Sequence, residues 1–189
     1  VRADRIRAIA GVPVGAVFDP EALRRAAARL RRSGVFAAVS LREADSLNAD
    51  ASLDTELELT DAKPRRFGFG LELSTNEGLG ISGFWLHRNL LGGAERLRID
   101  GEIDGIGGQT GGVDYTFGAR YTRPATFNED TDLYVETELE SLNEESYSSD
   151  SFRFEAGIVR YASDQRTYTF GLGVERARTQ DAFGTRNYT

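Results

Sequence analysis

Several residue types are absent or scarce in this 189-residue chain, and each absence excludes a class of protein. The chain has no cysteine, which excludes a disulfide framework and thiolate chemistry. Its single histidine, His87, excludes a metal site built from several histidines. No run approaches the roughly 20 apolar residues of a membrane-spanning helix, and a net charge of −7 argues against a nucleic-acid partner. A transmembrane β-barrel is compatible with all of these absences, because its strands are short.

The composition changes near Ala62-Lys63-Pro64. Residues 1–63 are rich in alanine and arginine and contain only three glycines and two aromatic residues, whereas residues 64–189 contain 18 glycines and 17 aromatic residues. The first composition is typical of helices and the second of strands and turns. We therefore predict two parts, residues 1–63 and residues 64–189.

The first part is predicted to contain two helices followed by two strands. Asp4 and Asp19 stand where a side chain can cap the first turn of a helix, and Gly11 and Gly34 stand where the two helices end. Leucines that alternate with acidic residues predict that the last strand is half-buried. The expected elements are helices over 5–10 and 20–33 and strands over 35–43 and 53–59.

The second helix carries five arginines. They could indicate an anion-binding site, but we interpret them as a solvated helix face, which is the commoner role of such a run. The five residues are Arg24, Arg25, Arg29, Arg31 and Arg32.

The second part alternates apolar and polar residues through seven predicted strands of roughly ten residues, with an eighth over 184–189. The same period fits a soluble barrel, with apolar residues inside, and a membrane barrel, with apolar residues facing lipid. Strand length and aromatic residues near strand ends favour the membrane barrel. The aromatic residues expected in its interfacial girdles are Phe67, Trp85, Tyr121, Tyr134, Tyr161 and Tyr168.

The membrane interpretation predicts which side chains share a face. The lipid-facing set is Leu97, Ile99, Tyr115, Phe117, Phe152, Phe154, Phe170 and Leu172. The lumen-facing set is Asp100, Glu102, Arg120, Glu138 and Glu155.

Several stretches resemble a known family. Residues 18–39, which begin Phe18-Asp19-Pro20, are similar to the later part of a POTRA domain, a small β-α-α-β-β periplasmic module. Residues 83–97, GFWLHRNLLGGAERL, resemble early barrel strands of the Omp85 (surface antigen D15) superfamily, and 67–70 resemble its first barrel strand. The ending 184–189, GTRNYT, resembles the branch that includes TamA.

The resemblance implies a mainly β fold: a truncated POTRA domain over 1–63 and the first part of a sixteen-strand antiparallel transmembrane barrel over 64–189. We expect the POTRA strand that would precede Val1 to lie in a longer protein, since the chain has neither an initial methionine nor a signal peptide.

The function implied by the resemblance is the insertion of client β-barrel or autotransporter proteins into the outer membrane, with the POTRA part in the periplasm. The expected partners are client outer-membrane proteins, the lipid bilayer and a periplasm-spanning protein that contacts the POTRA region. Such a protein needs no cofactor and breaks no covalent bond. Two alternatives remain open: a two-partner secretion channel or porin-like pore, and a soluble ligand-binding barrel.

In this family the first barrel strand pairs weakly with the last, and the resemblance places that seam at Phe67, Gly68, Phe69, Gly70, Leu71 and Glu72. Gly68 and Gly70 share a face and supply no side-chain contact across the strands, which weakens pairing on that face. The alternative is that the two glycines relieve crowding in the lumen.

We predict no catalytic residue and no metal site. An outer-membrane phospholipase arrangement needs serine two residues after the histidine, and here that position is Asn89. We therefore expect His87 to be a polar residue at a strand end, near the membrane interface. Glu136, Glu138 and Glu140 could hold a cation, but a wet lumen wall explains them more simply.

Overall fold

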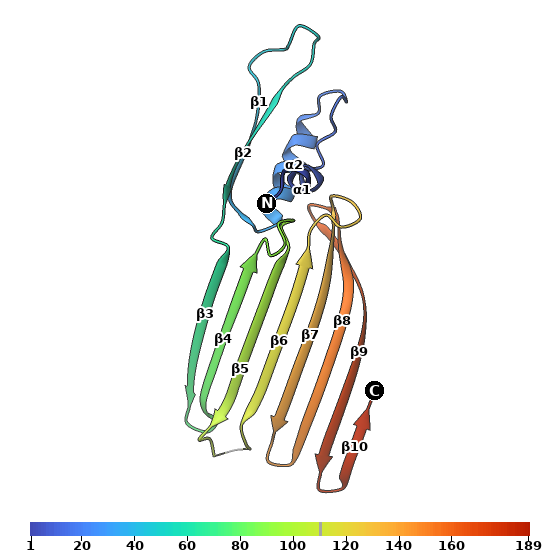
Figure 1. Cartoon of the computed structure of the whole chain (residues 1–189). Helices are drawn as coiled ribbons and strands as arrows, with labels where there is room; N and C mark the ends of the chain where they lie inside the picture. The colour runs from blue at the N-terminus through green and yellow to red at the C-terminus, as the bar shows by residue number, and fades with distance from the viewer. Residues whose placement is uncertain (110) are drawn as a thin grey trace.

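The computed structural model describes residues 1–109 and 111–189, which form a small N-terminal unit above a long curved sheet (Figure 1). The N-terminal unit comprises α1 (Ala3–Ala10), α2 (Pro20–Arg32), β1 (Phe36–Glu43) and β2 (Thr55–Asp61). The sheet comprises β3 (Arg65–Ser74), β4 (Gly78–Arg88), β5 (Arg96–Ile106), β6 (Asp114–Arg123), β7 (Thr131–Asn143), β8 (Tyr147–Ser163), β9 (Arg166–Asp181) and β10 (Gly184–Tyr188). None of the described helices is long and apolar enough to cross a membrane.

The two helices begin and end for local reasons. Asp19 caps α2 as predicted, because its Oδ1 accepts the Glu21 N–H at 2.9 Å. The predicted cap of α1 is wrong: the helix begins at Ala3, so Asp4 lies within its first turn, where its charge favours the helix dipole. Gly11 ends α1 in the left-handed conformation, with φ of 61°.

The core of the N-terminal unit extends into the sheet. Ile9 and Leu30 from the two helices are almost fully buried and pack with Val35 and Phe36. The same cluster includes Ala94, from the turn after β4, together with Ala125 from the turn after β6. Because the sheet supplies part of this core, the unit and the sheet fold against one another.

Arginines of α2 reinforce this contact with charge. The Arg29 side chain, 9% exposed, donates to both carboxylate oxygens of Asp130 at 2.9 and 2.6 Å. Arg32 also donates to Asp130, at 3.1 Å, and its guanidinium lies 3.8 Å from the Tyr161 ring. The interpretation of this helix as a solvated face is therefore wrong for Arg29 and Arg32. It holds for Arg24 and Arg25, which are exposed and pair within the helix and its cap.

Further hydrogen bonds fasten α1 to the same turns. The Arg5 side chain donates to the carbonyl oxygens of Pro124 at 2.5 Å and Ala125 at 3.3 Å. The Arg2 backbone N–H donates to the Gly92 carbonyl at 2.9 Å. Both turns are thus held by backbone polar groups as well as by the shared core.

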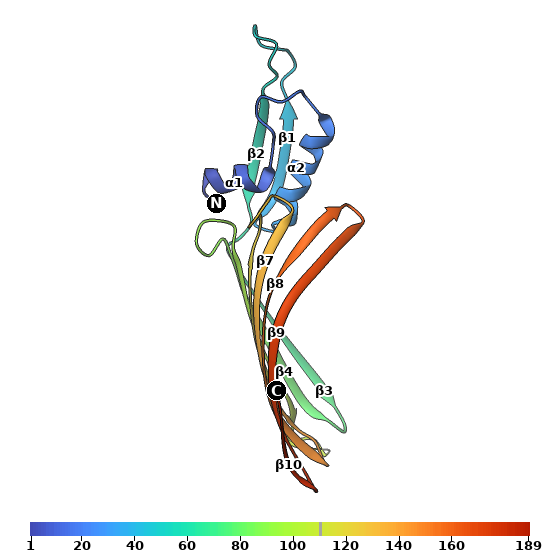
Figure 2. The ribbon, with the colours of Figure 1, turned by 90° about the vertical axis from the view of Figure 1, so that its right-hand side faces the viewer.

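The sheet is an antiparallel meander in sequence order, from β3 to β10. The seven predicted strands and the eighth over 184–189 are all observed. Strands β4, β6 and β8 end beside the N-terminal unit, which we call the near end, and β3, β5, β7 and β9 run to the far end (Figures 1 and 2). Within the described residues, β3 and β10 each have a neighbour on one side only, so the sheet is open.

The Asp130 ion pair gives a testable pH dependence. Hydrogen bonds from Arg29 hold the pKa of Asp130 below its usual range, so the contact is complete above the unfolded pKa of about 4 and is lost as pH falls through the lower folded pKa. We expect Asp130→Asn to weaken the contact by about 2 kcal/mol at pH 7, or roughly thirtyfold in hydrogen-exchange protection of α2. In this variant the hydrogen-exchange protection of α2 should not fall further near pH 4 through protonation of residue 130, because asparagine does not titrate.

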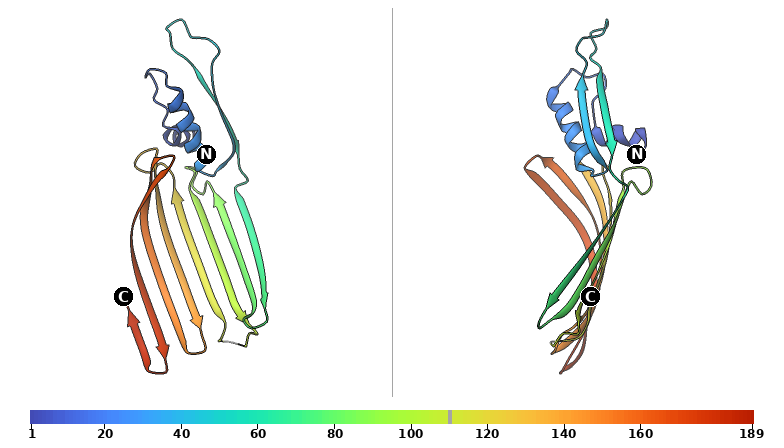
Figure 3. Two further views of the ribbon diagram at one scale, coloured as in Figure 1. Left: turned by 180° about the vertical axis from the view of Figure 1, so that it is seen from behind. Right: turned by 90° about the vertical axis from the view of Figure 1, so that its left-hand side faces the viewer.

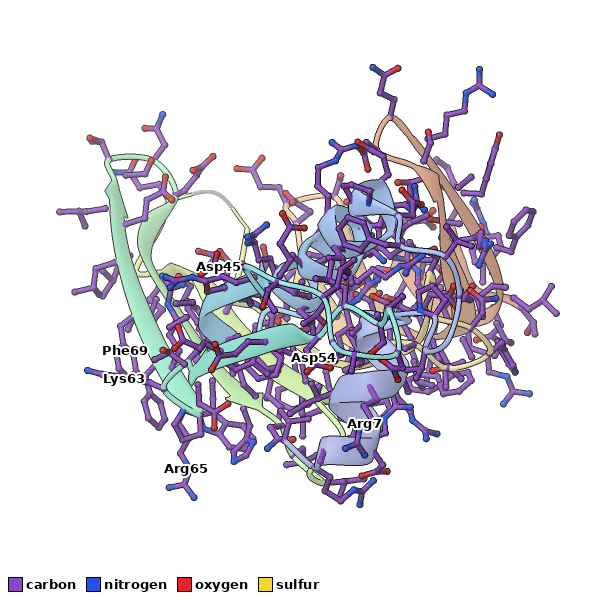
Figure 4. All side chains as sticks on the ribbon, turned by 90° about the horizontal axis from the view of Figure 1, so that it is seen from above. Arg7, Asp45, Asp54, Lys63, Arg65 and Phe69 are labelled. Atoms are coloured by element: carbon purple, nitrogen blue, oxygen red, sulfur yellow. The ribbon has the colours of Figure 1, made fainter. Side chains whose placement is uncertain are left out.

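The matched control is Asp45→Asn, which makes the same change in the connection between β1 and β2, away from the sheet (Figures 1 and 4). Equal protection of α2 in the Asp130 variant and this control would show that the ion pair does not hold the unit to the sheet.

Candidate functional site: a two-faced sheet with a free first strand

Strand register gathers the apolar side chains on one face of the sheet. Directly paired residues share a face, and the pairs Ile99–Ala119 and Phe117–Leu139 run from one strand to the next through the sheet. Followed through every pair, the register puts the whole predicted lipid-facing set on this face. The predicted lumen-facing set lies on the opposite face, so both groupings are confirmed as shared faces.

The apolar face is the convex one. Viewed along the strands, the sheet forms an arc with the N-terminal unit over its concave side, and Phe69 projects outward from the arc (Figure 4). Phe69 is 89% exposed and Leu172 is 86% exposed. Side views from opposite directions show the bend of the sheet (Figure 2 and the right panel of Figure 3). A soluble ligand-binding barrel needs its apolar residues inside, so this arrangement contradicts that alternative.

The concave face carries a series of ion pairs between strands. Arg120 of β6 pairs with Glu136 of β7, and Arg153 of β8 contacts Glu138 at 3.2 Å and Glu175 at 3.1 Å. Within the described residues no cluster of three or more histidine, aspartate or glutamate side chains has the spacing of a metal site. Two of the three glutamates considered for a cation site thus have arginine partners, in agreement with a polar wall.

Aromatic rings on the concave face cover glycines of adjacent strands. Tyr134 is 2% exposed, lies against Gly157 and Gly171, and donates a hydrogen bond to Glu155. The Arg120 guanidinium lies 4.6 Å from the Tyr134 ring. The prediction that Tyr134 belongs to an interfacial girdle is therefore wrong.

Tyr161 also differs from its predicted place in a girdle. Its ring contacts Arg32 of the N-terminal unit, and its hydroxyl donates to Asp132 at 3.4 Å. Phe67, Trp85, Tyr121 and Tyr168 do share the convex face.

All six predicted seam residues lie in β3, the first strand of the sheet. Phe67, Phe69 and Leu71 project from the convex face and are each more than half exposed. The remaining three alternate onto the concave face, where Glu72 lies opposite Gly80 of β4. Strand β3 pairs with β4 along its whole length, and its other edge has no neighbour within the described residues.

The two glycines of β3 make closer contacts than the sequence predicts. Gly68 is paired with Phe84, whose ring occupies the space that a side chain at position 68 would fill. The Phe84 ring in turn lies 4.3 Å from the Arg98 guanidinium. Gly70 faces the Ser82 side chain. Gly68 itself supplies no side-chain contact, but the Phe84 ring covers it, which fits the alternative that this glycine relieves crowding.

His87 lies next to the end of β4, as expected for a strand-end residue, and its ring meets Trp85 edge-on with centroids 5.7 Å apart. Asn89 has φ of 61°, and its Oδ1 accepts the Ala94 N–H at 3.0 Å. Asn89, two residues after His87, therefore shapes the turn.

Sequence analysis missed the contact between Arg29 and Asp130. These residues are separated by 101 positions, and no local pattern links them. The sequence around Ala94 did carry a signal for the contact between the unit and the sheet. Ala94 is a small residue that follows Gly92 and Gly93, and such a turn can pack closely against another part of the protein.

Comparison with known proteins shows a similar fold in a solved structure. No protein-family model matches the chain, and no curated protein matches its sequence. The chain is similar to the crystal structure of BamA from Haemophilus ducreyi lacking POTRA domains 1-3, with a TM-score of 0.68 and 18% sequence identity. The match covers 96% of this chain and 34% of that chain, so this chain spans about a third of the length of that structure. The predicted mainly β, antiparallel architecture is thus confirmed, and the fold of this chain is like that of the matched part of the BamA structure.

Proposed function

We propose that the chain is part of an outer-membrane β-barrel of the Omp85 kind, with the sheet in the bilayer and the N-terminal unit in the periplasm. The observation that carries this proposal is the outward placement of the apolar face, on which Phe69, Leu71 and Leu172 are more than three-quarters exposed. Exposed apolar surface of this extent is unfavourable in water and favourable against lipid tails. The similarity to BamA supports the same placement.

The N-terminal unit is proposed to be POTRA-like. Its order of two helices followed by two strands agrees with the later part of such a module. The structural match covers 96% of the chain, which leaves too few residues uncovered to omit this unit. A periplasm-spanning partner that binds here is part of the proposal, as is membership of the TamA-like branch, which rests on the resemblance of residues 184–189 alone.

The proposed activity is the insertion of client β-strands at the free edge of β3. In lipid every backbone N–H and C=O must be hydrogen-bonded within protein, so placing a new strand in the bilayer is costly. A free strand edge offers unpaired backbone N–H and C=O groups to an incoming strand. The hydrogen bonds that form are between backbones, so they do not depend on the client sequence. Phe67 and Phe69 would hold β3 against lipid while its edge accepts the client. Neither a cofactor nor a covalent step is required.

Membrane placement is tested by two neighbouring substitutions in β6. Phe117→Arg puts a charge on the convex face near the middle of the strand and should lower the free energy of unfolding by about 2–4 kcal/mol. Thr116→Arg puts the same charge on the concave face, between Glu102 and Glu140, and should cost little. Denaturant titration in lipid vesicles measures both. If the two variants unfold alike, the convex face does not contact lipid.

Client pairing is tested with single cysteines at 68–72 in the full-length protein, which is convenient because this chain has no cysteine. Disulfide crosslinks to the terminal strand of a stalled client should form in one register. A cysteine at Thr137 in β7, which is paired on both sides, should form none. Locking the β3 edge by an engineered disulfide should block client assembly. Normal assembly by the locked protein would exclude this edge as the route and would favour a pore or secretion channel.

A further inference from the structure

Both ends of the sheet carry clusters of charged side chains. Acidic side chains gather at the far end: Glu72, Glu77, Asp104, Asp114, Glu144 and Glu145. Basic side chains gather at the near end: Lys63, Arg65, Arg66, Arg88, Arg96 and Arg123.

Three acidic residues at the near end have partners elsewhere. Asp130 and Glu129 pair with Arg29 of the N-terminal unit. Glu95, 4% exposed, accepts the backbone N–H groups of Gly93 and Leu91 at 2.8 and 3.3 Å. These carboxylates therefore do not neutralise the basic residues of the convex face.

Two of the basic side chains belong to that convex face. Arg65 shares it with Phe67 and Phe69 by strand alternation, and Lys63 and Arg65 both project from the outer side of the arc (Figure 4). Both residues are exposed, and neither side chain makes an ion pair within the described residues. They form an uncompensated cationic pair at the base of β3.

The surface beneath this pair suits the rest of a lipid molecule. The next row toward the far end is the aromatic pair Phe67–Trp85, which fits the polar–apolar boundary of a bilayer. The row after that is a notch, because Gly83 and Gly101 are paired with each other between Phe69 and Phe117.

This notch is part of an apolar groove of about 640 Å³ that also includes Ile81 and Ile103. Phe69 lies four residues from Arg65, or about 13 Å along the strand. This distance exceeds the interfacial layer of about 5–8 Å on each side of a bilayer, so the groove reaches the depth of the acyl chains.

From this arrangement we infer that the convex base of β3 and β4 is a binding site for an anionic phospholipid of the periplasmic leaflet. Lys63 and Arg65 contact the phosphate and the anionic headgroup, Trp85 and Phe67 pack against the glycerol region, and an acyl chain occupies the notch over Gly83 and Gly101. The site lies on the strand proposed to receive clients, so a bound lipid would occupy the membrane beside that edge.

The inference rests on the proposed membrane placement. A soluble phosphate could use the two cations, but it would leave the apolar groove below them empty. The groove and the cations together favour a lipid over a free anion, and the charge of the pair favours an anionic headgroup over a zwitterionic one.

Trp85 is the only tryptophan of this chain and lies within the proposed site, so its fluorescence reports on the adjacent lipid. The intact protein and its Trp85→Phe variant are reconstituted in phosphatidylcholine vesicles that contain a minor fraction of phosphatidylglycerol, and the difference between them isolates the Trp85 emission. Brominated acyl chains are carried either by the phosphatidylglycerol or by an equal fraction of the phosphatidylcholine. We expect the brominated phosphatidylglycerol to quench Trp85 about threefold more strongly, because each nearby cation attracts the anionic headgroup.

The double variant Lys63→Gln/Arg65→Gln should lose this preference, whereas both brominated lipids still quench it. Arg66→Gln removes one positive charge from the adjacent residue on the concave face and should keep the preference. Equal quenching of the unaltered protein by the two lipids would overturn the anionic-lipid site while leaving the membrane placement intact. No quenching by either lipid would instead contradict the membrane placement itself.

Discussion

Side-chain alternation with a period of two is the constraint on which this structure depends. Once β3 to β9 are paired in register, the predicted lipid-facing side chains of successive strands lie on one face of the sheet. The curvature of the sheet then puts these side chains outside and the charged ones inside. The Arg120–Glu136 and Arg153–Glu138 pairs, the rings that cover concave glycines and the exposed phenylalanines all follow from that single register.

The N-terminal unit depends on the sheet for its own completion. Its helices alone bury few large side chains, and the cluster around Ile9 and Leu30 closes only with Ala94 and Ala125 from two sheet turns. The Arg29–Asp130 pair adds a directional contact at the same place. These contacts hold the unit over the concave side of the sheet.

Local patterns in the sequence were enough to predict the strands, the α2 cap at Asp19 and the two faces of the sheet, because each depends on residues near in sequence. Contacts between distant elements were not predictable in this way. The sequence indicates that Arg29 is one of several surface arginines, and only the folded structure places Asp130 beside it. Tyr134 fitted a girdle by its position near a strand end, yet a one-residue difference in phase puts it on the concave face. The ring of Phe84, which covers Gly68 from β4, was likewise not predictable from the local pattern around this glycine.

Spin labels at successive positions 99–103 of β5, a strand paired on both sides, test the two-faced sheet most directly. In lipid vesicles, labels replacing Ile99, Gly101 and Ile103 should collide with dissolved oxygen, whereas labels replacing Asp100 and Glu102 should collide with a water-soluble nickel complex. The predicted result is an accessibility that alternates at every residue with this phase. The opposite phase, or accessibility without alternation, would contradict a sheet that faces lipid with its convex side.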